Sequence, residues 1–64
     1  MVKINGVELN ITCQTLTQYI IENGYDIKRV AVELNGDILP KSQYENTILN
    51  DGDIIEIVSF VGGG

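Results

Sequence analysis

The stretch that decides the fold is Ile54-Ile55-Glu56-Ile57-Val58-Ser59-Phe60-Val61, an apolar run that is interrupted only by Glu56 and Ser59. In an extended strand, successive side chains point to opposite faces of the sheet. Apolar residues fall on both faces of this stretch, which is typical of a strand with neighbours on both sides. We therefore expect residues 54–61 to form the central strand of a sheet.

The two faces of this predicted strand are expected to have different roles. Ile55 and Ile57 are assigned to the hydrophobic core. The opposite face then leaves apolar side chains in solvent, and soluble proteins seldom expose a contiguous apolar patch without a use. We predict that this patch, called the docking patch below, contacts a partner protein. It consists of Ile54, Val58 and Phe60.

Three glycines, Gly62-Gly63-Gly64, follow the strand directly. Glycine contributes no side-chain packing and loses more backbone entropy on folding than any other residue, so the run does not help the fold. If extended, it projects about 10 Å beyond Val61 and ends in a carboxylate. The run is either a frayed end or a functional tail, and the sequence alone leaves both interpretations open.

An Asn-Gly pair near the start of the chain predicts a β-hairpin. Asn5-Gly6 separates two alternating runs, at about residues 1–5 and 7–12. The pair suits a type I′ turn because both central residues of that turn need positive φ. Cys13 then comes at the end of the second strand, where we expect a small, semi-buried residue.

A second Asn-Gly pair predicts another hairpin in the middle of the chain. Val30, Val32 and Leu34 alternate with polar or small residues before Asn35-Gly36. The strand that follows, Ile38-Leu39, is short because it stops at Pro40. Proline lacks an amide donor, so this piece is expected at an edge of the sheet.

Two segments have the spacing of a helix capping box. Thr15 and Gln18 begin an amphipathic pattern that predicts a helix over about residues 15–24. Ser42-Gln43-Tyr44-Glu45 repeats the spacing and predicts a single helical turn. The ring of Tyr44 is expected at the rim of the core.

The order of these elements is hairpin, helix, strand, short strand, turn and strand, which indicates an α+β fold. We expect a mixed sheet of four to five strands with one main helix packed on one face. The simplest arrangement places the first and last strands side by side and parallel in the middle of the sheet.

Composition limits the classes of partner. The chain has 64 residues and a formal charge of −5, which argues against nucleic acid and against anionic membrane surfaces. No apolar run is long enough to span a membrane, and no signal peptide is recognised, so a cytoplasmic protein is expected. The acidity serves solubility or steers the protein toward a basic partner surface.

The sequence contains few residues that carry chemistry. It has no histidine and one cysteine, so neither a metal cluster nor a Cys–His nucleophile is expected. Asp51-Gly52-Asp53 matches the start of a calcium loop but lacks the ligands that must follow, and it is interpreted as a turn. By elimination the candidate reactive group is the Gly64 carboxylate, which needs activation, for example by ATP-dependent adenylation. No cofactor is expected to be bound by the chain itself.

Over its whole length the chain resembles the ThiS family, small ubiquitin-like β-grasp proteins that carry sulfur in thiamine biosynthesis. The resemblance rests on Thr15-Leu16, residues 30–36, Ile38-Leu39-Pro40, Asp51-Gly52-Asp53, Ile55-Glu56-Ile57 and Gly63-Gly64. One departure is Tyr44, where the family often has Trp; both are aromatic. The resemblance implies a β-grasp domain over residues 1–61 and a flexible glycine tail over 62–64.

The resemblance also implies a function and partners. An E1-like enzyme of the ThiF or MoeB type would adenylate Gly64 with ATP, and a cysteine desulfurase would supply sulfur to form a thiocarboxylate. Thiazole synthase of the ThiG type would then take up the sulfur, while Gly62 and Gly63 lie in the narrow active-site channels of the partners. The chain would be a co-substrate and not an enzyme.

Three alternatives remain open from the sequence. The chain could be the small sulfur-carrying subunit of molybdopterin synthase, which ends in the same way. It could be a ubiquitin-like modifier that is joined to target lysines through Gly64. It could also be a plain interaction module whose terminal glycines have no role.

Overall fold

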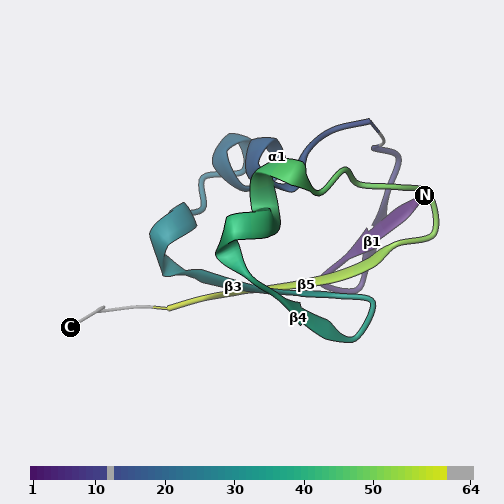
Figure 1. The fold of residues 1–64 in the computed structure, drawn as a ribbon. Coiled ribbons are helices and arrows are strands. Elements are labelled where there is room, and N and C mark those ends of the chain that lie inside the picture. Colours follow the sequence, from purple (N-terminus) through teal and green to yellow (C-terminus); the bar gives the residue numbers. More distant parts are fainter. Residues whose placement is uncertain (12, 61–64) are drawn as a thin grey trace.

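A five-stranded mixed sheet, covered on one face by a helix, makes up the fold in the computed structural model (Figure 1), which describes residues 1–11 and 13–60. The strands lie in the order β2-β1-β5-β3-β4. β1 runs parallel to β5, and the other neighbouring pairs are antiparallel. In chain order the elements are β1 (Val2–Ile4), β2 (Val7–Leu9), α1 (Leu16–Glu22), η1 (Ile27–Arg29), β3 (Val30–Leu34), β4 (Asp37–Leu39), η2 (Lys41–Asn46) and β5 (Ile54–Ser59).

β5 is the central strand, as its two apolar faces predict. Its neighbours are β1 on one side and β3 on the other. Ile55 is paired with Ile4 of β1 and with Leu34 of β3. The predicted parallel pairing of the first and last strands is therefore confirmed, and β4 lies at the edge of the sheet before Pro40.

Both Asn-Gly turns hold β5 through the asparagine side chains. Asn5 and Asn35 have φ of 51° and 52°, and the glycines that follow them also have positive φ. The amide of Asn5 pairs with the backbone of Ile57: Ile57 N donates to Oδ1 at 2.7 Å, and Nδ2 donates to Ile57 O at 3.2 Å. From the other side of β5, Asn35 Oδ1 accepts from Ile54 N at 2.9 Å. Each turn thus extends the hydrogen bonding of the sheet by side-chain atoms.

The hydrophobic core lies between α1 and one face of the sheet. Leu16 and Ile20 of α1 pack there, and Ile55 and Ile57 are buried as expected. The Thr15–Gln18 capping box is formed, and Gly24, with a φ of +80°, follows the C-cap Asn23. The other buried members of the core are Val2, Ile4, Val30, Val32, Tyr44 and Leu49.

Tyr44 is more deeply buried than the sequence indicated. Its relative exposure is 1%, so it belongs to the core and not to its rim. The segment around it is a 3-10 helix with Pro40 as N-cap, and no side chain caps it, so the predicted Ser42 capping box does not form. η2 has six residues and is longer than the single turn expected, and the Tyr44 ring within it is buried in the core. Burial raises the pKa of Tyr44, and a hydrogen bond with the backbone of Val32 partly offsets this rise.

β2 is shorter than expected because its partner ends. Leu9 is paired with Val2, the first residue of β1, so the pairing of β2 stops where β1 stops. Cys13 is consequently not the semi-buried end of a strand. It is exposed, and its φ of 61° lies in the left-handed region.

Candidate functional site

β5 leads into the predicted tail and has different surroundings in its two halves. Its pairing with β1 ends at Ile55. On the same side of β5, the side-chain amide of Asn5 makes hydrogen bonds as far as Ile57. Pairing with β3 continues farther, to Ser59, and Phe60 N donates to Arg29 O at 2.7 Å. Within the described residues, the last part of β5 is therefore supported from the β3 side.

The residues predicted to carry the chemistry lie beyond this point. Gly64, predicted to be modified, and Gly62 and Gly63, predicted to lie in partner channels, fall outside the described residues, as does Val61. The geometry that can be given is that of the strand that precedes them.

The docking patch is exposed as predicted. The relative exposures are 51% for Ile54, 55% for Val58 and 54% for Phe60. These side chains belong to the open face of the sheet, because Ile55 and Ile57 alternate with them and point into the core. The exposure is thus a consequence of the two-residue period of β5. Whether a partner covers these residues remains a prediction.

Ile38 of β4 is a further exposed apolar residue of this face, which no sequence pattern had indicated. It is 80% exposed and is paired with Glu33 of β3. Glu33 is in turn paired with Glu56 of β5, so two carboxylates lie directly across from each other between Ile38 and the docking patch. Like charges in this position destabilise a sheet. The register between distant strands reveals this pair, and no local pattern does.

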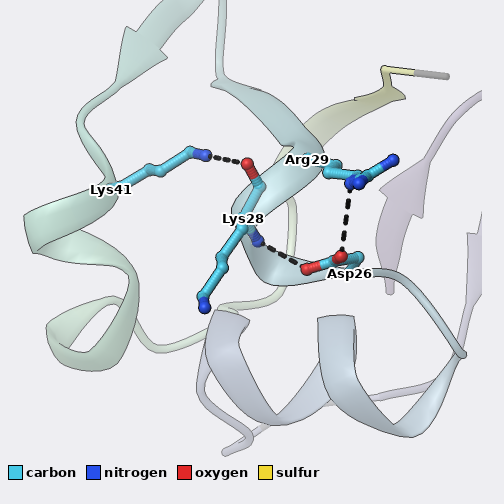
Figure 2. Close-up of polar contacts among 4 residues, drawn as sticks. All are labelled: Asp26, Lys28, Arg29 and Lys41. Carbon is cyan, nitrogen blue, oxygen red and sulfur yellow. Dashed lines mark hydrogen bonds and ion pairs between the residues drawn. The ribbon is translucent and has the colours of Figure 1, made fainter. Parts of the chain in front are cut away.

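A group of basic side chains lies beside the end of β5. Lys28 and Arg29 belong to η1, and Lys41 begins η2. Figure 2 shows Lys41 Nζ donating to Lys28 O, at 2.8 Å. Asp26 caps η1 by accepting from Lys28 N at 2.9 Å, and its other oxygen lies 3.6 Å from Arg29 Nε.

The described residues form no enclosed site. No pocket is found among them, and no group of three or more His, Cys, Asp or Glu side chains is placed to hold a metal ion. In residues 1–11 and 13–60, no helix has the length and apolar character needed to cross a membrane. Besides Tyr44, the pKa of Tyr19 is raised, by burial and then by the nearby Tyr25. The features available for recognition are therefore surface features: the docking patch, the carboxylate pair and the basic side chains.

Comparison with known proteins gives consistent matches. The model of the ThiS family matches residues 2–64. The sulfur carrier protein ThiS of Bacillus subtilis is 40% identical, and the match covers 100% of this chain and 100% of that protein. A crystal structure of the thiamine biosynthesis protein (ThiS) of Geobacter metallireducens superimposes with a TM-score of 0.73 at 28% identity, covering 98% of this chain and 97% of that chain.

A longer relative contains a similar segment. A thiazole synthase of Paramagnetospirillum magneticum is 47% identical over 95% of this chain, and the chain spans 19% of the length of that protein. The matches to ThiS proteins, by contrast, extend over nearly the full length of both chains. The structural match also confirms the expected α+β fold as a ubiquitin-like β-grasp. The chain belongs to the ThiS family.

Proposed function

We propose that this chain is a sulfur carrier protein for thiamine biosynthesis and acts as a co-substrate, not as an enzyme. The observation that carries the proposal is the family match over residues 2–64, which includes the terminal glycines. The names of the Bacillus subtilis and Geobacter metallireducens relatives support the same role. The arrangement of β5 is compatible with it, because the central strand of the sheet, still paired with β3 at Ser59, precedes the glycine run in the sequence.

The proposed chemistry takes place at Gly64. An E1-like enzyme of the ThiF or MoeB type transfers AMP from ATP to the carboxylate and releases pyrophosphate. A persulfide sulfur that originates from a cysteine desulfurase attacks the carbonyl carbon, and AMP leaves with the electron pair of the C–O bond. A thiol then attacks the outer sulfur of the resulting acyl disulfide and forms a new disulfide with it, which releases Gly64 as a thiocarboxylate. ATP is consumed by the partner, and the carrier itself binds no cofactor.

Glycine suits this chemistry for physical reasons. A residue without a side chain leaves the carbonyl carbon open to attack. Gly62 and Gly63 can adopt conformations that other residues avoid, which allows the chain to follow a narrow channel. The proposed reaction draws on ATP and intracellular sulfur donors, so we place the carrier in the cytoplasm.

Thiazole synthase is the proposed acceptor of the sulfur. The Paramagnetospirillum magneticum protein with that name contains a segment that is 47% identical to this chain. A carrier segment and its acceptor in one polypeptide would always be close to each other, which favours a functional link. The docking patch is the proposed contact surface, because its three apolar side chains lie along the strand that leads to the tail.

Intact-mass spectrometry tests the proposal. The purified chain is incubated with a ThiF-type enzyme, ATP, a cysteine desulfurase, cysteine and a thiol reductant. The expected product has one oxygen replaced by one sulfur, and a chain lacking Gly63-Gly64 stays unmodified. An unchanged mass of the full chain with an active enzyme refutes the proposal. Stable conjugates of higher mass, joined to lysines of other proteins, indicate a protein modifier instead.

A further inference from the structure

The positive charge of this chain is concentrated at one end of β5. The sequence has four Lys and Arg residues against nine Asp and Glu residues. Three of the four belong to η1 and η2: Lys28, Arg29 and Lys41, called the basic cluster below. The fourth, Lys3, is paired with Ile54 at the opposite end of β5. An acidic protein thus carries a local basic surface in one place.

The basic cluster is attached to the residue from which the tail continues. Phe60 N donates to Arg29 O at 2.7 Å, so the backbone of the cluster holds the end of the strand. Lys41 Nζ donates to Lys28 O at 2.8 Å and joins the start of η2 to the same segment. In Figure 2 the end of β5 passes close to Arg29, whereas the side chain of Lys28 points away from it. The segment that carries these charges therefore borders the end of β5.

The charge of the cluster is only partly neutralised. Asp26 lies 3.6 Å from Arg29 Nε, and both side chains are more than half exposed. Among residues 1–11 and 13–60, neither Lys28 nor Lys41 has a carboxylate within ion-pair distance. Their exposed ammonium groups remain available to a negative surface, although such rim charges contribute more to the rate of association than to the final affinity.

We propose that the basic cluster contacts an acidic protein surface that borders the entrance of a partner's binding site for the chain end. The inference rests on the proposed function, in which Gly64 must enter such a site. A nucleic acid or an anionic membrane fits poorly, because the chain as a whole has a charge of −5 and would be repelled by an extended polyanion. A local acidic surface at the entrance attracts the cluster while meeting little of the remaining negative charge.

Charges on the open face of the sheet favour one orientation of the chain as it approaches its partner. The paired carboxylates of Glu33 and Glu56 lie there and would repel an acidic surface. Attraction at the basic cluster and repulsion at the carboxylate pair together favour approach with the tail end first. The cluster then acts on orientation during the encounter, before the docking patch is covered.

Three Lys→Glu variants with the same change in charge test the proposal. Lys28→Glu and Lys41→Glu alter the cluster, whereas Lys3→Glu alters the other end of β5. Each replaces +1 by −1 and so changes the formal charge from −5 to −7. All three side chains are exposed, and thermal melting verifies that each variant is folded.

The measurements are the kinetics of Gly64 conversion by a ThiF-type enzyme and, separately, binding of the chain to that enzyme and to a ThiG-type thiazole synthase. At low salt we expect Lys28→Glu and Lys41→Glu to lower kcat/KM for the ThiF-type enzyme about tenfold through KM, with kcat unchanged, and to weaken binding to at least one of the two enzymes. Lys3→Glu, which lies on the open face beside Ile54 and across from Glu8, lowers kcat/KM less than either cluster variant. At about 1 M salt, where the Debye length is about 3 Å, the variants converge.

Other outcomes separate the two proposals. If the unmodified chain is converted but the three variants behave alike at every salt concentration, the role of the basic cluster is refuted and the proposed function stands. If the chain is not converted but binds with the expected difference between Lys28→Glu and Lys3→Glu, the cluster is a contact surface and the proposed chemistry is wrong. Failure of the unmodified chain to bind either enzyme overturns both.

Discussion

The two halves of β5 differ in how they are supported, although they belong to one strand. Residues 54–57 are held on both sides, by β1 and the Asn5 side chain on one side and by β3 and the Asn35 side chain on the other; Ile57 N donates to Asn5 Oδ1 and Ile54 N donates to Asn35 Oδ1. Among the described residues, Val58 and Ser59 pair with β3 and Phe60 N donates to Arg29 O of η1, and the side chains of residues 58–60 are exposed. The first half fixes the strand in the fold, and the second half presents apolar surface next to the tail. Stability and recognition can therefore be altered separately, by substitutions only a few residues apart.

The largest loss of stability is expected from Ile55→Ala in the first half. Ile55 is buried in the core, so the substitution removes apolar contacts and leaves a cavity, at a cost of about 3 kcal/mol in the free energy of unfolding. In a domain of 64 residues this is a large share of the total. Chemical denaturation measures the loss, and Val58→Ala serves as the control, with a change below about 0.5 kcal/mol. Equal losses in the two variants would contradict the division of β5.

A smaller loss is expected from Asn5→Gly, which separates hydrogen bonding from backbone conformation. Glycine retains the positive φ of the turn but cannot make the two hydrogen bonds to Ile57. We expect a loss of about 1–2 kcal/mol, because the backbone groups of Ile57 lose their partners. Amide hydrogen exchange should become faster at Ile57 first.

Asn35→Gly is the matched control for that experiment. It removes the contacts to Ile54 and Asp53 but leaves those of Ile57 intact. Faster exchange is then expected at Ile54 and not at Ile57. If amide exchange is unchanged at Ile57 in Asn5→Gly and at Ile54 in Asn35→Gly, the asparagine side chains do not stabilise β5.

The sequence predicted the parts of the fold that depend on local patterns. Both Asn-Gly turns, the Thr15–Gln18 capping box and the central position of β5 follow from residue spacing, and the structure confirms them. The positive φ values of Asn5 and Asn35 were predictable for the same reason. What the patterns did not show is that these two side chains also bind β5.

The features that sequence patterns did not predict depend on contacts between residues far apart in the chain. The Asn5–Ile57 hydrogen bonds join residues 52 positions apart, and the Glu33–Glu56 pair depends on the register of β3 with β5. Tyr44 was placed at the rim because the path of η2 into the core has no local signal. The candidate site has a different limit: a glycine has no side chain from which a role can be inferred, so Gly64 was assigned by elimination and by resemblance.

The smallest change in stability is expected from Phe60→Asp, at the end of the second half. Phe60 is 54% exposed, so its replacement should change the free energy of unfolding by less than about 0.5 kcal/mol. Binding to a partner enzyme should nevertheless weaken at least tenfold, because aromatic residues at the centre of an interface often contribute 2 kcal/mol or more. Ile21→Asp is the control: it introduces the same charge at an apolar residue of α1 that is 61% exposed. Calorimetric titration measures partner binding by both variants, and chemical denaturation measures their free energies of unfolding. Unfolding of Phe60→Asp would place Phe60 in the core, and equal binding by the two variants would remove Phe60 from the docking patch.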